Sequence, residues 1–280
     1  MHDQSLVACL SIGMIDSHVH LLPDRLAAKI RAFFDQGAPS RMAYPIDHGF
    51  VLDRLSEAGI TKVWSLPYAH KPLVADGMNE SLREIARTSH SVSIINGSTV
   101  HPHDNDPLVV VRRAVEDHHS KVLKLHCSVG DFAIDNPLLD PVWEYVSEHR
   151  LPVVIHAGHH ENGFTETDEV DPIELVAKRF PEAVLIIAHC GHRAAAQALD
   201  IIERNTNVYA DLTPVVFEPV ALPVGRAQQL HTKLLFGTDA PNTAVSAESA
   251  LEHLRSQNLT DEAWQAITHD NAERLTAAVH

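Results

Sequence analysis

Cysteine is scarce in this 280-residue chain, and its three cysteines, Cys9, Cys127 and Cys190, are widely spaced. This number and spacing exclude a disulfide framework and a CxxC zinc site, so we expect reduced thiols. Long apolar runs are also absent, since no stretch approaches the roughly 18 to 20 residues that a membrane helix requires. The apolar stretch 6–15 has no basic cluster before it and is not typical of a signal peptide, so we expect a cytoplasmic protein.

Basic residues are outnumbered, because 22 Lys and Arg stand against 37 Asp and Glu, for a formal net charge of −15. The acidic residues are spread along the chain, which disfavours nucleic acid and anionic membranes as partners and leaves a small-molecule substrate as the better one. The chain also lacks a GxSxG elbow and a phosphate-cradling loop. These absences argue against a serine hydrolase and against nucleotide chemistry.

Histidine, by contrast, is abundant, with 21 residues. Histidine is the commonest metal ligand and titrates near neutral pH, so this number favours a metal site. Apolar residues make up 45% of the chain, which is enough for a large core. We expect one domain over residues 1–280.

Short apolar, β-branched segments recur eight times and alternate with segments of helical periodicity. Such segments are typical of strands buried on both faces, and their alternation with helices indicates parallel βαβ units. Eight units favour a single, distorted (β/α)8 TIM barrel with C-terminal helices, which is an α/β fold. The predicted strands lie within residues 13–20, 61–67, 91–100, 121–127, 151–158, 183–191, 207–212 and 233–241.

The alternative fold is a doubly wound open sheet. It is disfavoured because the first strand lacks a nucleotide-binding glycine pattern, and because polar residues end many strands and do not cluster at one switch point. The segment 35–49 has no clear period and could cover the barrel mouth. Helical spacing predicts helices within 47–59, 77–90, 136–150 and 171–182, and two short helices within 260–279.

The segment "MIDSHVHLLP" (14–23) places Asp16, His18 and His20 at every second position of the first predicted strand. Side chains alternate along a strand, so the three share one face, and both histidines lie at the C-terminal end, where the active sites of such barrels are found. A single histidine on an apolar strand is more often a hydrogen-bonded core residue. A pair in this pattern favours a ligand role.

Other strands bring polar residues to the same rim, since the fifth predicted strand ends in His156, the sixth in His189 and the eighth in Asp239. Burying several imidazoles and a carboxylate together is unfavourable unless they pair or bind a cation. Neutral imidazoles with a carboxylate suit Zn²⁺, and also Mn²⁺, Fe²⁺ or Co²⁺, with one coordination position open for water. We therefore expect one divalent metal, zinc foremost, in a catalytic site.

These segments resemble the amidohydrolase superfamily, and more closely its amidohydrolase-related branch, which includes aminocarboxymuconate semialdehyde decarboxylase and related hydrolases. The resemblance spans nearly the whole chain, from "IDSHVHLLP" through "KLH", "PVVIHAG" and "AHCG" to "FGTDAP" and "DNAERL". It implies a (β/α)8 barrel in which His18, His20, His156 and Asp239 surround one metal. It also implies that His189 lies beside the metal as an acid/base or substrate-polarising group.

The role of Lys124 in "KVLKLHC" stays open. Other members of the superfamily bridge two metals through a carboxylated lysine or a glutamate at the end of the fourth strand, whereas this branch usually keeps one metal. Otherwise Lys124 is a buried partner of the carboxylates, and His126 lines the pocket. Asp16 either orients an imidazole or has a purely structural role in tying down its strand.

Substrate selection falls to the loops that follow the strands. Arg41 and Arg193 could each hold a substrate carboxylate with a forked guanidinium, although a solvated arginine is the plainer interpretation. His159 follows the fifth strand on the side of the active site. Relatives are often dimers, so a homodimer in which the neighbour closes the pocket is also an expectation.

The sequence predicts a metal-dependent hydrolase that activates water to cleave an amide, lactone or ester bond in a small, carboxylated or cyclic molecule. Asp239 would act as ligand and base, and His189 would stabilise the developing oxyanion. The alternative is a metal-dependent, non-oxidative decarboxylase of an unsaturated or aromatic acid. A third hypothesis, of another class, is an inactive barrel that only binds a metal or ligand.

Overall fold

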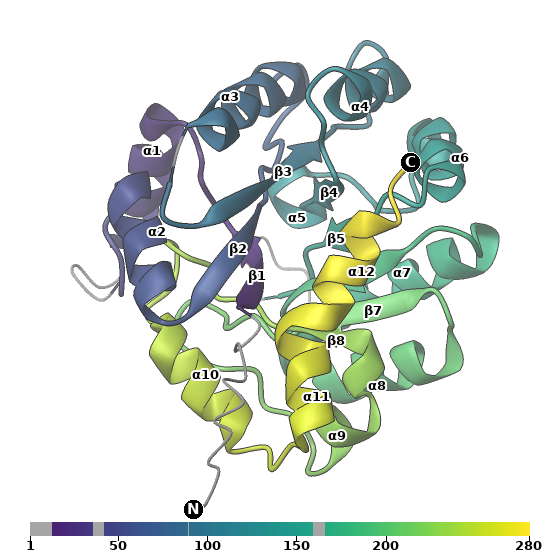
Figure 1. The fold of residues 1–280 in the computed structure, drawn as a ribbon. Coiled ribbons are helices and arrows are strands. Elements are labelled where there is room, and N and C mark those ends of the chain that lie inside the picture. The colour runs from purple at the N-terminus through teal and green to yellow at the C-terminus, as the bar shows by residue number, and fades with distance from the viewer. Residues whose placement is uncertain (1–12, 36–41, 89, 159–165) are drawn as a thin grey trace, which may run out of the picture.

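The computed structural model describes residues 13–35, 42–88, 90–158 and 166–280. Within these residues, eight strands follow one another around a sheet in chain order, and every neighbouring pair is parallel. A parallel bridge between Val19 and Ala240 joins the first strand to the segment after the last, so the sheet nearly closes into a barrel (Figure 1). The predicted (β/α)8 barrel is confirmed.

The strands are shorter than the segments predicted for them. All eight end before the C-terminal bound of their predicted segment, because residues such as His126, His156 and Asp239 leave the hydrogen-bonded ladder at the rim. β2 alone begins one residue before its predicted segment. The strands are β1 (Met14–Val19), β2 (Ile60–Ser65), β3 (Ser93–Thr99), β4 (Val122–Leu125), β5 (Val153–Ile155), β6 (Leu185–Ile187), β7 (Val208–Asp211) and β8 (Leu234–Leu235).

Helices surround the strands (Figure 1). The four helices predicted between strands correspond to α2, α3, α6 and α7, and the side chain of Asp47 caps α2 by accepting a hydrogen bond from Phe50 N. The α-helices are α1 (Asp24–Asp35), α2 (His48–Glu57), α3 (Ala75–Arg87), α4 (Pro107–Glu116), α5 (Cys127–Gly130), α6 (Asp140–Glu148), α7 (Glu166–Arg179), α8 (Ala195–Arg204), α9 (Arg226–Gln229), α10 (Ala247–Arg255), α11 (Asp261–Gln265) and α12 (Asn271–Ala277). Among the described residues, no helix has both the length and the apolar character needed to cross a membrane.

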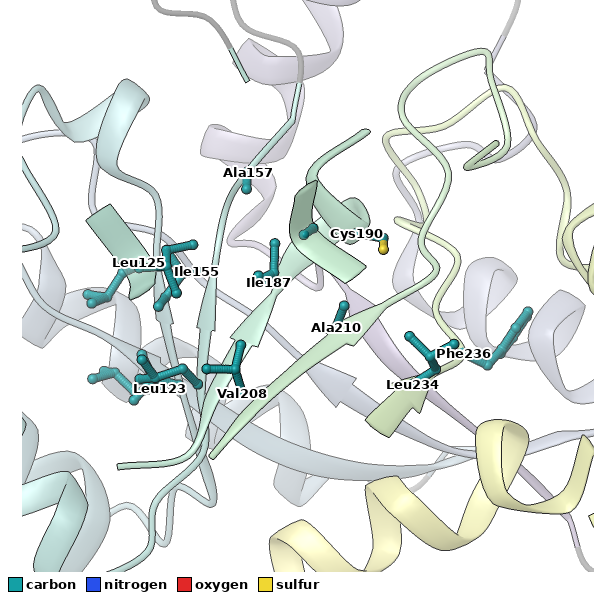
Figure 2. Packing of buried hydrophobic residues seen from close by; sticks show 14 of the residues in the cluster. Leu123, Leu125, Ile155, Ala157, Ile187, Cys190, Val208, Ala210, Leu234 and Phe236 are labelled. Atoms are coloured by element: carbon teal, nitrogen blue, oxygen red, sulfur yellow. The ribbon is translucent and has the colours of Figure 1, made fainter. Parts of the chain in front are cut away.

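Alternate residues of each strand face the helices and the barrel interior. In β4, Leu123 and Leu125 belong to the outer core that packs against the helices, whereas Val122 and Lys124 are buried on the inner side. Figure 2 shows the outer layer continuing through the neighbouring strands to Cys190. Cys190 is therefore turned away from the rim, as its position beside His189 predicts, and burial raises the pKa of its thiol to about 12.

Apolar side chains fill the barrel at its N-terminal end. Ala272 and Leu275 of α12 belong to this inner cluster, so α12 closes the barrel at this end. The two short helices predicted within 260–279 are α11 and α12. A π-helical segment, Ala266–Asp270, joins α11 to α12. The strand residues of the cluster are Ile15, Trp64, Val122, Val154, Ile186 and Leu235. Further along the strands, toward their C-terminal ends, the inward side chains become polar, and there the candidate site lies.

Candidate metal centre

Three ligand atoms gather at the C-terminal rim, where β1 and β8 meet. His18, His20 and Asp239 are buried, and one donor atom of each lies within 4.8 Å of the others. Asp239 Oδ1 is 3.0 Å from His20 Nε2 and 3.9 Å from His18 Nε2. The structure thus brings together three of the four predicted ligands.

Hydrogen bonds on the far side of each imidazole fix which nitrogen faces Asp239. His18 Nδ1 lies 3.0 Å from Asp211 Oδ2, and His20 Nδ1 lies 2.6 Å from the main-chain oxygen of Leu66. Carboxylate and carbonyl oxygens only accept, so each Nδ1 carries the proton and each Nε2 presents a lone pair. Burial lowers the pKa of His18 well below its ordinary value, and Lys124 and His20 lower it further.

Two lone pairs and a carboxylate therefore face one another in a buried site. Such a group of acceptors is unfavourable without a cation or proton between them. Imidazole and carboxylate donors are the set that Zn²⁺ and related divalent ions prefer at catalytic sites. The residues present therefore fit a divalent metal.

Asp239 depends on local backbone geometry to reach this position. Its φ is +65°, in the left-handed region, and its main-chain N–H donates to His18 O at 2.9 Å. Asp16 supports the same segment from β1, since its carboxylate accepts hydrogen bonds from His18 N, Thr238 N and Thr238 Oγ1. Burial raises the pKa of Asp16 to about 7. Asp16 thus ties β1 to the loop that carries Asp239 and makes no bond to an imidazole ring.

His156, the fourth predicted ligand, lies outside that group of three. Its ring stacks on His126 with centroids 3.7 Å apart and an interplanar angle of 14°. His156 Nε2 is buried and has no hydrogen-bond partner among the residues that the structure describes. An orphaned buried nitrogen is unfavourable, and a bound cation would give it a partner.

His189 lies in a turn after β6, whereas the sequence placed it at the end of a strand. The strand ends at Ile187, and residues 189–192 all have a positive φ, between 46° and 70°. Only Gly191 among the four adopts such a φ readily, so the turn is strained. It aims the ring so that His189 Nδ1 lies 3.2 Å from Thr213 O and donates to it. Burial lowers the pKa of His189 to about 4, which leaves Nε2 with a free lone pair at neutral pH.

Six side-chain rings form a closed circuit at the rim, which we call the ring circuit. Consecutive centroids lie 3.7 to 5.3 Å apart, and each ring contacts the next and the last contacts the first. In order, the members are Tyr68, His126, His156, His189, His18 and His20. The circuit draws on the ends of β1, β2, β4, β5 and β6, so five strands determine the shape of the site.

Lys124 lies beneath this circuit and is fully buried. Its Nζ is 3.3 Å from His18 Nε2, next to the group of ligand atoms. Burial lowers the pKa of Lys124 to about 8, while the nearby carboxylates of Asp211 and Asp239 act in the opposite direction. Lys124 therefore contributes a donor on the floor of the site.

Some predicted residues lie elsewhere. Arg193 is exposed in the turn after His192. Arg41 and His159 lie outside the described residues, as does part of the 35–49 segment. Asp211 and Tyr68 were not among the predicted site residues, although "NVYADL" carries Asp211 near its end just as other predicted strands carry polar groups near theirs.

Comparisons with known proteins show the family and the fold of this chain. A family model described as amidohydrolase matches residues 15–275. An uncharacterised TIM-barrel protein from Bordetella bronchiseptica superposes with a TM-score of 0.75 at 18% identity, covering 95% of this chain and 99% of that one. A 5-carboxyvanillate decarboxylase from Sphingomonas paucimobilis gives 0.70 at 12% identity, covering 96% and 100%. A Saccharomyces cerevisiae dihydroorotase in complex with 5-fluoroorotic acid gives 0.65 at 16%, covering 95% and 84%. The comparison with curated proteins finds no match.

Proposed function

Because the chain belongs to the amidohydrolase family, we propose that it is a metal-dependent hydrolase that cleaves an amide, lactone or ester bond of a small molecule. The observation that carries the proposal is the set of two Nε2 lone pairs and one carboxylate oxygen that meet at the rim. Three buried acceptors that meet at one point are unfavourable together and would be satisfied by a bound cation, which supports the proposal, although Lys124 Nζ also approaches one of them, His18 Nε2, to 3.3 Å.

His18, His20 and Asp239 would hold the metal, with His156 as a further ligand through its orphaned Nε2. A divalent cation, zinc foremost, polarises a carbonyl oxygen and lowers the pKa of a coordinated water toward neutrality. The imidazoles remain neutral as the ligand role requires, because burial lowers the pKa of His18 and of His156 well below the ordinary value.

His189 is suited to accept a proton at Nε2. Its Nδ1–H is engaged with Thr213 O, so the free nitrogen is Nε2, which is unprotonated at neutral pH. A hydrogen bond from His189 to a developing oxyanion would require that nitrogen to gain a proton first. We therefore assign His189 the role of general base before that of oxyanion donor. Asp239, held by its main-chain bond to His18, is the second group able to take up a proton.

The proposed substrate is a carboxylated or cyclic small molecule. The similar structures include a 5-carboxyvanillate decarboxylase and a dihydroorotase bound to 5-fluoroorotic acid, and both of these compounds are carboxylated rings. The second candidate function is non-oxidative decarboxylation, because the free His189 Nε2 is also suited to carry a proton to and from a substrate carbon. Hydrolysis incorporates solvent oxygen into the product, whereas decarboxylation releases carbon dioxide without consuming water. Isotope-labelled water therefore separates the two.

The first experiment is elemental analysis of the protein purified without added metal or chelator. We expect about one equivalent of zinc, manganese, iron or cobalt, by the ligand chemistry of this set. His18→Ala together with His20→Ala should remove that metal, whereas His189→Ala should keep it and lose turnover. Normal metal content in the double variant would contradict the assignment of the ligands.

A further inference from the structure

Asp211 connects the ligand His18 to the base His189. It lies at the C-terminal end of β7 and is fully buried. Its Oδ2 is 3.0 Å from His18 Nδ1, and its Oδ1 accepts hydrogen bonds from the main-chain N–H groups of His189, at 2.8 Å, and Thr213, at 3.2 Å. One oxygen thus engages a ring and the other engages the main chain.

We propose that Asp211 is a positioning residue that sets the tautomer of His18 and thereby its ability to bind a metal. This inference rests on the proposed function, since it takes His18 to be a ligand. A carboxylate accepts and does not donate, so His18 must place its proton on Nδ1. The lone pair then lies on Nε2, the nitrogen that faces Asp239. Such outer partners of a metal-bound histidine also raise its basicity as a ligand.

The two main-chain donors prevent an amide at this position from serving the same purpose. In an Asp211→Asn variant the amide oxygen must stay with His189 N and Thr213 N, because an NH₂ group there would face two donors. The NH₂ group is then directed at His18 Nδ1 and donates to it. The proton of His18 moves to Nε2, and the ring presents no lone pair to the metal. Asparagine, although it has nearly the same shape as aspartate, therefore moves the His18 proton onto the nitrogen that would bind the metal.

The contact also links the ligand to the base. The same carboxylate holds the first residue of the strained turn 189–192 through the N–H of His189. Because both oxygens belong to one rigid group, the positions of the His18 ring and of the His189 backbone are set together. Asp211 lies outside the segments that carry the resemblance to the family, which fall at β1, β4, β5, β6, β8 and α12.

The test measures Zn²⁺ affinity of the full chain by competition with a chromophoric chelator. We expect Asp211→Asn to bind zinc about 10- to 100-fold more weakly, the usual effect of losing such a partner. Asp16→Asn is the matched control. Its amide oxygen can still accept from His18 N and Thr238 N, and its NH₂ can donate to the Thr238 hydroxyl, so it should keep the affinity of the unaltered chain.

A second measurement does not depend on how well a variant folds. Nitrogen-15 NMR of the imidazole nitrogens in the metal-free, unaltered chain, with His18 assigned by its loss in His18→Gln, should show the His18 proton on Nδ1. A proton on Nε2 would overturn the inference, as would undiminished zinc affinity in Asp211→Asn or an equal loss in Asp16→Asn. Absence of zinc binding by the unaltered chain would overturn the proposed function itself. Zinc binding by the unaltered chain is therefore measured before that of any variant, which keeps the two outcomes apart.

Discussion

Gly237 allows β8 and β1 to approach closely enough to form the metal centre, and Gly237→Ala tests this. A Cβ added at Gly237 would lie 2.2 Å from Thr213 Oγ1 and 2.9 Å from His18 Cβ. Both distances are shorter than any normal contact, so the backbone or both neighbours must move. Inserting a methyl group into a packed interior destabilises by about 1–3 kcal/mol. For a chain of this size, that lowers the melting midpoint by about 2–12 °C.

The shorter of the two contacts, with Thr213 Oγ1, shows that Thr213 is the neighbour that has to move most. Thr213 Oγ1 is buried and has no hydrogen-bond partner within the described part of the chain, so Thr213→Ala removes the clashing atom without breaking a bond seen there. The main-chain bonds of Thr213 to Asp211 and His189 remain. Thr213→Ala alone should therefore change the midpoint little, and Gly237→Ala with Thr213→Ala should recover at least half of the loss.

The assay is thermal unfolding followed by circular dichroism for the four proteins of this double-mutant cycle. Coupling between contacting residues is expected to exceed about 0.5 kcal/mol, whereas independent sites add. A midpoint for Gly237→Ala equal to that of the unaltered chain would refute the reasoning. Strict additivity of the two substitutions would refute it too, since the contact with Thr213 would then have no effect.

Three further predictions concern stability. The pKa of Glu174 is lowered to about 2, chiefly by hydrogen bonds from Arg204, so this pair stabilises the fold above the ordinary Glu pKa of 4.5 and ceases to do so as the pH falls toward 2. The difference in melting midpoint between the unaltered chain and Glu174→Gln should narrow through that window; a constant difference would contradict the assignment. Trp143→Ala should destabilise by about 3–5 kcal/mol because Trp143 is fully buried, and clearly more than Trp264→Ala, whose ring is partly exposed. Adding zinc at 100 times its Kd to chelator-treated protein should stabilise it by about 2.7 kcal/mol, measured as a rise in the midpoint that His20→Ala removes.

The sequence predicts well what depends on periodicity. Alternation along one strand places His18 and His20 on the same inner face, and apolar segments at regular spacing predict eight parallel strands. The reason is physical, because side chains of a strand alternate whatever their surroundings. The rim residues follow from the same rule, since they lie just beyond the last apolar residue of each strand.

The sequence predicts poorly what depends on the backbone beyond the strands. Nothing in "AHCGH" apart from Gly191 indicates four successive residues with positive φ, and that turn decides where the His189 ring points. Asp211 looks like any acid at the end of a strand until its three donors, two of them more than 20 residues away, are known. Such partners are set by the closure of the barrel and leave no local pattern.

The closure of the ring circuit has a consequence for motion. In an open row of rings, the two end rings have a neighbour on one side only and can turn away from it. In this closed circuit there are no end rings, because every ring has a neighbour on both sides. If the His156 ring turns, we expect it to displace both of its neighbours, His126 and His189, and each of these to displace the next ring around the circuit. We therefore expect side-chain fluctuations at the rim to be concerted. Truncating Tyr68, which is not among the proposed ligands, would open the ring circuit and leave its two neighbours, His126 and His20, with one ring contact in place of two.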